Sequence, residues 1–363
     1  MKKAEKQHVT YKYELDSKSD FSRHIIELDE YIQRVEAEID VTRLTEFINA
    51  VKESGETLCF YGAGGAMSPA TFAADLAMNE GIVAMALTPL NIVAMNESVI
   101  SKIRFVAITG SGSPSDVVAA TEHLVNVAPD RVLCITTASL EHKDRFGHLD
   151  NHVGLLMKEH APGNIMCIDL SIHKDGYVGT RKHLCLALIM YKAFHPDASN
   201  LVEQLILPDV PPFELRLPNE MTLVDLSDLH ILYGTTGRTA AVDMEGRMLE
   251  CGVMPAMATD LKNFTHGRHT YINTRPNSAI LMLVAPQDEK FVKAITKLIP
   301  DDRPMIFVRT QRSDMLGALQ LMICTFYLSI ELGATKNINM HSPGTPKWGR
   351  SLWSLKLKDY YEV

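Results

Sequence analysis

Short apolar runs alternate with helical patterns along most of the chain. In residues 19–52 the apolar positions Ile25, Leu28, Ile32, Val35 and Ile39 are three or four residues apart, which predicts a helix or a pair of helices. Continuous apolar runs predict strands at 58–62, 103–109, 132–136 and 165–169, with helices at about 68–79 and 115–127. Strands without a polar face are typical of a parallel sheet that helices cover on both sides.

The pattern restarts after a proline-rich segment, 207–220, which is the expected linker. HILYGTTGRTA (230–240) mirrors LCFYGAGGAMS (58–68), and residues 279–295 repeat the strand, loop and helix that begin near residue 103. Two landmarks in the same order indicate an internal duplication. We therefore expect an N-terminal tail with helices (1–54), a first α/β domain (55–206), a second α/β domain (221–335) and a C-terminal tail (336–363).

Composition narrows the class of protein. The chain has 363 residues, of which 46% are apolar and 22% charged, so two globular domains with large cores are expected. A net charge of −8 disfavours a nucleic-acid partner, although a local anion pocket remains compatible with it. The six cysteines form no CxxC pair and most lie in apolar runs, which predicts reduced core residues in a cytoplasmic protein. We expect no signal peptide, and no apolar run long enough to place the chain in a membrane.

The segment TGSGSPSD (109–116) leaves an expected strand and enters an expected helix. It carries hydroxyls at Thr109, Ser111, Ser113 and Ser115. Glycines at 110 and 112 allow close backbone approach, and a helix N-terminus suits a phosphate. The alternative is a helix that Ser113 or Ser115 merely caps. No Walker lysine is present, which favours a phosphorylated metabolite over a nucleoside triphosphate. The corresponding loop of the second half, VAPQDE (284–289), lacks hydroxyls, so one phosphate per chain is expected.

Two tandem α/β domains, this loop, and a glutamate followed 16 residues later by His-Gly resemble the double sugar-isomerase (SIS) domain proteins. The likeness is particularly to the isomerase half of glucosamine-6-phosphate synthase and to its deglycase relatives, and it covers roughly residues 25–355. The resemblance implies that each domain is a flavodoxin-like three-layer sandwich, in which a parallel sheet lies between helices. It also implies a homodimer with the active site at the subunit interface.

The resemblance implies a binding site in the first half. The sugar phosphate would be held by Thr109, Ser111, Gly112 and Ser113, while Pro114 departs from the family pattern, so that Ser113 or Ser115 must substitute. Gly62 and Gly64 of the GAGG turn would line the same pocket. Thr180 of GYVGTRK (176–182) would supply a hydroxyl to the sugar.

The resemblance also implies catalytic residues. Glu250 would move a proton between C1 and C2, and His266 would open the sugar ring. The family's His-Gly-Pro is His-Gly-Arg here, so Arg268 is a departure and His269 an additional histidine in the expected site. Lys347 is the candidate for a Schiff-base lysine in the tail that closes the active site. Arg350 is its alternative, which could only bind substrate because arginine does not deprotonate.

The chemistry of these residues is consistent with such roles. Asp243, Arg247 and Glu250 are spaced to share one helix face, where a solvated salt-bridge ladder is the alternative reading. A carboxylate beside the apolar run CGVMPAM (251–257) could act as a base, and a histidine titrates near neutral pH. Arg247 would touch the sugar or order Glu250.

Isomerisation, deamination or deglycation of a phosphorylated sugar or aminosugar is therefore expected, without a metal or organic cofactor. A phosphosugar sensor that does not turn over its ligand is the alternative from another class. Two weaker patterns remain: His148 and His152 as a metal-binding pair, and GAGG as the start of a dinucleotide fold.

Overall fold

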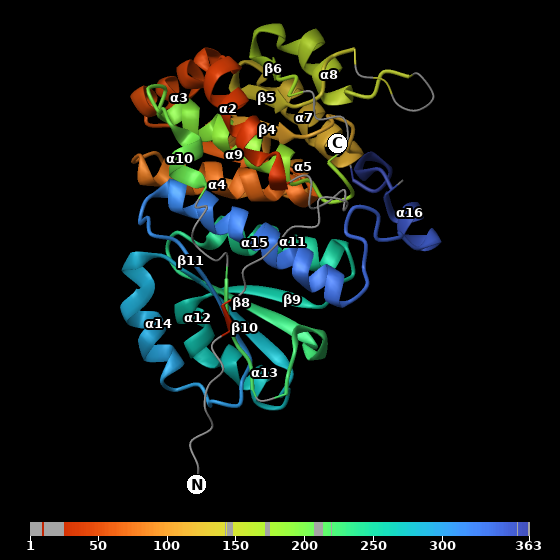
Figure 1. The fold of residues 1–363 in the computed structure, drawn as a ribbon. Coiled ribbons are helices and arrows are strands. Elements are labelled where there is room, and N and C mark those ends of the chain that lie inside the picture. The colour runs from red at the N-terminus through yellow and green to blue at the C-terminus, as the bar shows by residue number, and fades with distance from the viewer. Residues whose placement is uncertain are drawn as a thin grey trace. The chain divides into compact units, whose positions relative to one another are not determined.

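The computed structural model describes residues 9–10, 25–141, 143, 148–170, 175–206, 213–218, 220–353 and 355–361 (Figure 1). The chain divides into two compact units. Unit 1 contains Met1–Asp29, Asp175–Thr180 and Val202–Pro343, and unit 2 contains Glu30–Lys174, Arg181–Leu201 and Gly344–Val363. Each unit is built on one sheet, as the two expected α/β domains require.

Unit 2 holds a five-stranded sheet in the order β3-β2-β4-β5-β6. Its strands are β2 (Thr57–Tyr61), β3 (Ala84–Leu87), β4 (Ile103–Thr109), β5 (Val132–Thr136) and β6 (Ile165–Cys167). Every neighbouring pair is parallel, which confirms the prediction from the continuous apolar runs. Tyr61, Phe105 and Cys134 of three adjacent strands are fully buried in one cluster under α7.

The helices of this part of the chain are α2 (Leu28–Glu38), α3 (Thr42–Ser54), α4 (Met67–Asn79), α5 (Pro89–Val93), α6 (Glu97–Ile100), α7 (Ser115–Val127), α8 (His152–His160), α9 (Arg181–Phe194) and α16 (Lys347–Trp353). Of these, α4, α6, α7 and α8 contact strands of the sheet. The predicted pair in 19–52 is α2 and α3, and Leu28, Ile32 and Val35 are buried as their spacing predicts. The predicted helices at 68–79 and 115–127 are α4 and α7.

Unit 1 holds a six-stranded sheet in the order β1-β7-β11-β10-β8-β9. Its strands are β1 (Val9–Thr10), β7 (Glu214–Arg216), β8 (Asp228–Tyr233), β9 (Ala256–Asp260), β10 (Ser278–Val284) and β11 (Met305–Arg309). The four strands β8 to β11 are parallel, but β7 runs antiparallel to β11 and β1 antiparallel to β7. The expected purely parallel sheet is therefore wrong at this edge. Strand β7 lies inside the expected linker, 207–220.

The helices of unit 1 are α10 (Leu201–Leu205, except its first residue), α11 (Arg238–Glu250), α12 (Leu261–Asn263), the π-helix η5 (Phe264–Arg268), α13 (His269–Asn273), α14 (Glu289–Thr296) and α15 (Met315–Thr335). Helices α11 and α15 cover one face, and α12, α13 and α14 the other (Figure 1). This division of the helices follows from right-handed crossovers. The chain moves from β8 to β9 in one direction across the sheet and from β9 to β10 and β11 in the other, so the connecting helices lie on opposite faces.

Helix α15 corrects the expectation that no apolar run of the chain is as long as a membrane span. Its 21 residues, Met315–Thr335, are long and apolar enough to cross a membrane by length and composition alone, and 83% of its most apolar stretch is buried. The core helix of a globular protein has the same properties.

The two sheets share a strand order. Strands β3-β2-β4-β5 and β9-β8-β10-β11 each place the first strand of the motif between the second and the third. This order is what the predicted duplication requires. It also creates a switch point between β2 and β4, and another between β8 and β10, where the chain turns to opposite sides of the sheet. Ligands of open α/β sheets bind outside the carboxyl ends of the strands at such points.

Glu56 gives a pH prediction for unit 2. Its carboxylate accepts hydrogen bonds from Arg104 Nε at 2.7 Å and Arg131 Nη1 at 2.6 Å, and these bonds hold its pKa at about 2. Since this pKa is depressed on folding, the stabilisation is present above about pH 4.5 and is lost as the pH falls towards 2. We expect Glu56→Gln to lower stability at pH 7 by about 1–2 kcal/mol and to flatten its acid dependence, as measured by urea unfolding at pH 7, 4 and 3. Parallel pH profiles of the two proteins would contradict this assignment.

Candidate active site

The loop 109–115 joins β4 to α7 at the switch point of unit 2. Thr109 is 2% exposed, and its Oγ1 accepts a hydrogen bond from the Gly112 N–H at 3.0 Å. The hydroxyls of Ser111 and Ser113 lie 2.8 Å apart and are half-buried. The loop is therefore folded so that two neighbouring hydroxyls stand together at the carboxyl edge of the sheet.

Asn151 supports this loop from behind. Gly112 has φ +72°, and a Cβ built on it would lie 1.8 Å from Asn151 Oδ1, so only glycine fits. Asn151 is fully buried; its Oδ1 accepts from the Gly154 N–H at 2.9 Å and its Nδ2 donates to the Ala138 carbonyl at 2.9 Å. The sequence analysis missed this residue, and its place before α8 only signals a helix cap.

Helix α7 begins without a side-chain cap. Its N-cap residue is Pro114, and no side-chain hydrogen bond caps the helix. The alternative in which Ser113 or Ser115 serves as the cap is therefore wrong. In the first turn the Val117 N–H donates to Asp116 Oδ1 at 2.9 Å. The half-buried Ser115 lies at this N-terminus, where the helix dipole favours an anion.

The corresponding place in unit 1 is filled by the chain's own side chains. Gln287 Nε2 donates to Thr236 Oγ1 at 2.6 Å and to Thr235 Oγ1 at 3.0 Å, so the hydroxyls of the second glycine turn are engaged. The carboxyl group of Asp288 is buried and faces the N–H groups of Thr235 and Ala285 at 3.4 Å. This difference between the halves agrees with the expectation of one phosphate per chain.

Arg247 and Thr180 are brought together within unit 1. Arg247 is 2% exposed and forms an ion pair with Asp243, which is 3% exposed. Its guanidinium also donates to the Gly179 carbonyl at 2.6 Å and to Thr180 Oγ1 at 3.3 Å, and it lies over the ring of Phe326. The pair is therefore buried, and the alternative of a solvated salt-bridge ladder is wrong.

Thr180 is fully buried. Its N–H donates to Asp175 Oδ2 at 2.6 Å, and its hydroxyl accepts from Arg247. These contacts tie the segment Asp175–Thr180 to α11 and place it in unit 1. Asp175 was not singled out in the sequence, where only the Gly-Tyr-Val-Gly-Thr pattern indicated a function.

Glu250 ends α11 and is exposed. The apolar residues that follow it, Cys251, Val253 and Met254, are buried. These apolar side chains are therefore packed in the core, while the Glu250 side chain is exposed.

His266 lies in the π-helix η5, where the backbone departs from helical geometry at His266 and at Gly267, which has φ +117°. Such π-helical turns are frequent at functional sites. His266 and Arg268 are exposed, whereas His269 Nδ1 donates to the Phe264 carbonyl at 3.1 Å. Within unit 1, Glu250 ends a helix on one face of the sheet and His266 lies on the other face (Figure 1). A single copy of this unit therefore does not bring the two together.

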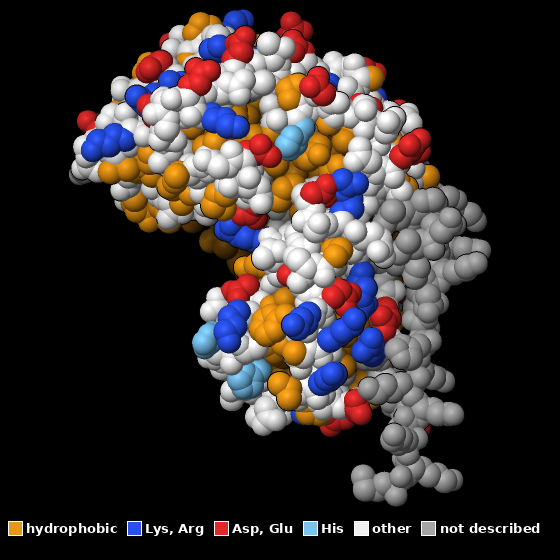
Figure 2. Space-filling model, turned by 90° about the vertical axis from the view of Figure 1, so that its left-hand side faces the viewer, with side chains coloured by type: hydrophobic (Ala, Val, Ile, Leu, Met, Phe, Trp, Pro, Cys, Tyr) orange, Lys and Arg blue, Asp and Glu red, His pale blue; other side chains and the backbone are white. Residues whose placement is uncertain are grey.

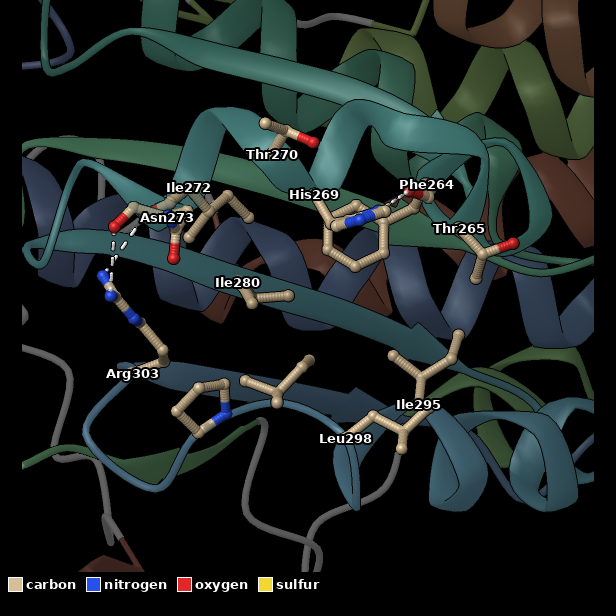
Figure 3. Close-up of a pocket in the computed structure, with 12 residues that line it drawn as sticks. Phe264, Thr265, His269, Thr270, Ile272, Asn273, Ile280, Ile295, Leu298 and Arg303 are labelled. Carbon is tan, nitrogen blue, oxygen red and sulfur yellow. Dashed lines mark hydrogen bonds between the residues drawn. The ribbon is translucent and has the colours of Figure 1, made fainter.

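A cavity of about 550 Å³ lies beside η5, between α13 and α14 (Figure 3). Its lining is mainly apolar and includes Phe264, Ile272, Ile280 and Ile295. Arg303 also lines it, but its guanidinium donates to the carbonyls of Ile272 and Asn273. This cavity is poorly suited to a sugar phosphate, which needs many polar partners.

Exposed apolar side chains occur on and after α14. Leu298, which lines the cavity, is 85% exposed, and Phe291 on α14 is 38% exposed. Figure 2 shows apolar side chains among Lys and Arg side chains in the lower part of the view. Helix α14 also exposes Lys290 and Lys293, whereas its Ile295 is buried.

The remaining candidates stand as follows. Gly62 is buried directly after β2, and Gly64 begins the turn η1 (Gly64–Ala66). Lys347 is exposed at the start of α16 in unit 2, and Arg350 lies in the same helix. Of the cysteines expected in the core, Cys167 is exposed.

The weaker pattern of His148 and His152 is not arranged as a metal-binding pair at helical spacing would be. His152 is the first residue of α8 and His148 precedes the helix, so the two do not share one helical turn. Among the described residues, no three His, Cys, Asp or Glu side chains are grouped as a metal site would need.

Comparison with solved structures places the fold. The chain superimposes on a tagatose-6-phosphate ketose/aldose isomerase from Escherichia coli with a TM-score of 0.66 and 15% identity, covering 93% of this chain and 98% of the other. The C-terminal domain of glucosamine-fructose-6-phosphate aminotransferase from Francisella tularensis superimposes with a TM-score of 0.60 and 12% identity, covering 88% of this chain and 97% of that domain. A glucosamine-6-phosphate deaminase from Thermotoga maritima superimposes with a TM-score of 0.58 and 13% identity, covering 88% of this chain and 97% of the deaminase.

These likenesses confirm the predicted α/β fold and, at the level of the fold, the resemblance to phosphosugar isomerases. No protein-family model matches the sequence, and no curated protein matches it by sequence.

Proposed function

We propose that the chain is a phosphosugar isomerase, or an aminosugar-phosphate isomerase-deaminase or deglycase, that moves a proton between C1 and C2 of its substrate. The observation that carries this proposal is the loop 109–115, which presents Ser111 and Ser113 at the switch point of unit 2 beside the uncapped start of α7. Its support from outside the chain is the shared fold of an isomerase and a deaminase that are named for 6-phosphorylated sugars.

The proposed roles follow the chemistry of each group. Thr109, Ser111, Ser113 and Ser115, with the N–H groups of the loop, hold the phosphate. Glu250 transfers the proton and His266 opens the ring. Arg247, fixed by Asp243 and Thr180, sets the orientation of the last turn of α11 and therefore of Glu250. Lys347 is the candidate amine where an imine is needed, as in deamination or deglycation.

The test is proton exchange in D2O. The protein is incubated with hexose, hexosamine and N-acylhexosamine 6-phosphates while the C1 and C2 protons are followed by NMR. Deuterium incorporation into one substrate supports an enzyme that forms an enediol-type intermediate and identifies its class of sugar. Absence of both binding and exchange with every member of the panel would exclude the proposed function.

We also predict a homodimer in which His266 of one copy acts with Glu250 of the other, because the two residues lie on opposite faces of one sheet. Mixing Glu250→Gln with His266→Asn, each inactive alone, should restore about a quarter to a half of the activity when subunits exchange. A fully active monomer in size-exclusion chromatography with light scattering, or no complementation between subunits shown to exchange, would contradict this prediction.

A phosphosugar sensor without turnover is the second candidate. It is favoured by the exposure of Glu250, since burial beside apolar groups suits a carboxylate base, and by Arg268 in place of the expected proline. In the D2O experiment a sensor gives chemical-shift changes on binding without deuterium exchange.

A further inference from the structure

The loop 109–115 lacks a cation. Its sequence TGSGSPS contains no Lys or Arg, and the next residue is Asp116. A phosphate monoester carries a charge of about −1.5 to −2 at neutral pH, and hydroxyl and N–H dipoles alone neutralise such a charge poorly. A phosphate site at this loop therefore needs a positive side chain from another element of unit 2.

Helix α9 brings a lysine to this place. A Cβ built on Gly110 would lie 3.8 Å from Lys182 Cδ and 4.0 Å from Thr137 Oγ1, so the Lys182 side chain passes directly beside the first glycine of the loop. Thr137 in turn donates to the Gly110 carbonyl at 2.8 Å and fixes the backbone there. Lys182 is half-buried, and its ammonium lies two covalent bonds beyond the Cδ atom that faces Gly110.

The next residue of α9 covers the other turn at the same edge of the sheet. A Cβ built on Gly65 would lie 2.0 Å from His183 Cε1, so the imidazole rests on the backbone of the GAGG turn after β2. The first turn of α9 thus lies against both glycine turns that flank the β2/β4 switch point. The glycine at 65 leaves the space that the imidazole occupies, whereas a Cβ at position 110 would meet Lys182 at an ordinary van der Waals distance.

We propose that Lys182 is the cation of the phosphate site and that it makes the site selective for phosphorylated ligands over their unphosphorylated parents. The inference rests on the proposed function, because it assigns a further specificity-determining residue to the same loop. Lysine acts here as a point charge, so it needs no fixed bidentate geometry and suits a phosphate held by several hydroxyls.

The test uses isothermal titration calorimetry with inorganic phosphate, with glucosamine 6-phosphate, and with glucosamine as the unphosphorylated control. We expect Lys182→Met to lower the affinity for inorganic phosphate and for glucosamine 6-phosphate by about tenfold or more, since a charge-assisted hydrogen bond is lost. Lys182→Arg should stay within about threefold of the wild type. Binding to the wild type should also weaken more steeply with added salt than binding to Lys182→Met. Lys158→Met, at an exposed position on α8 of the same unit, is the matched control and should bind as the wild type does.

The outcomes separate this inference from the function on which it rests. If Lys182→Met and Lys182→Arg, both folded by circular dichroism, bind phosphate as the wild type does while Gly112→Ala loses it, the loop is the phosphate site and the role of Lys182 is refuted. If the wild type binds neither phosphate ligand and shows no exchange with any sugar phosphate in D2O, the proposed function itself fails.

Discussion

Replacing Glu250 by Gln should lower the rate of C1/C2 proton exchange by at least about a thousandfold while leaving the affinity for the sugar phosphate within a few-fold of the wild type. An amide has nearly the same shape as a carboxylate but cannot accept the proton that must leave the carbon next to the carbonyl. Glu250 is exposed at the end of α11, so the substitution should not affect folding. The measurement is deuterium incorporation by NMR, with binding followed separately by calorimetry.

Two further variants make this result specific. Glu250→Asp keeps the carboxylate but withdraws it by one methylene, so it should retain partial activity. Its kcat should fall by a larger factor than its KM changes. Asp301→Asn removes another exposed carboxylate of unit 1 and should leave exchange unchanged. Full exchange activity in Glu250→Gln would remove this residue as the base and direct the search to the other carboxylates of the unit.

The fold could be predicted from the sequence where burial requires a run of apolar residues. Strands β2, β4, β5, β8 and β10 are mainly apolar and almost entirely buried, because helices cover both faces of each sheet, and such runs are visible without a structure. Strands β1 and β7 have only two and three residues, too few for any pattern. Helix α15 was missed for the opposite reason: it is buried nearly all round, so it shows no apolar stripe.

The site could be predicted only in part, because spacing fixes a helix face but not its surroundings. Asp243, Arg247 and Glu250 share the spacing of one face, yet the first two are buried and the third is exposed at the helix end. The spacing of 16 positions from Glu250 to His266 similarly does not indicate that the chain passes to the other side of the sheet between α11 and α13. Asn151 packs against Gly112, which lies far from it in the sequence, and Asp175 accepts a hydrogen bond from the Thr180 N–H that only the folded chain shows.

The buried ion pair of α11 gives the largest expected effect on stability. Arg247→Met should lower the free energy of unfolding of unit 1 by about 3–5 kcal/mol, because it leaves the Asp243 carboxylate buried without its partner. Asp243→Ala should cost a similar amount for the converse reason. The double variant, Asp243→Ala with Arg247→Met, should cost clearly less than the sum of the two, since it leaves no buried charge uncompensated.

Arg247→Lys separates charge from geometry. Lysine retains the positive charge but cannot donate to Asp243, Gly179 and Thr180 at once as the guanidinium does. We therefore expect intermediate stability in urea unfolding, together with a loss of kcat that exceeds any change in phosphate affinity, because the segment Asp175–Thr180 and the end of α11 would no longer be held to each other. Single variants that each unfold within about 1 kcal/mol of the wild type would show that the pair is not the anchor of this region. Wild-type kcat in Arg247→Lys would show that the orientation of Glu250 does not depend on these contacts.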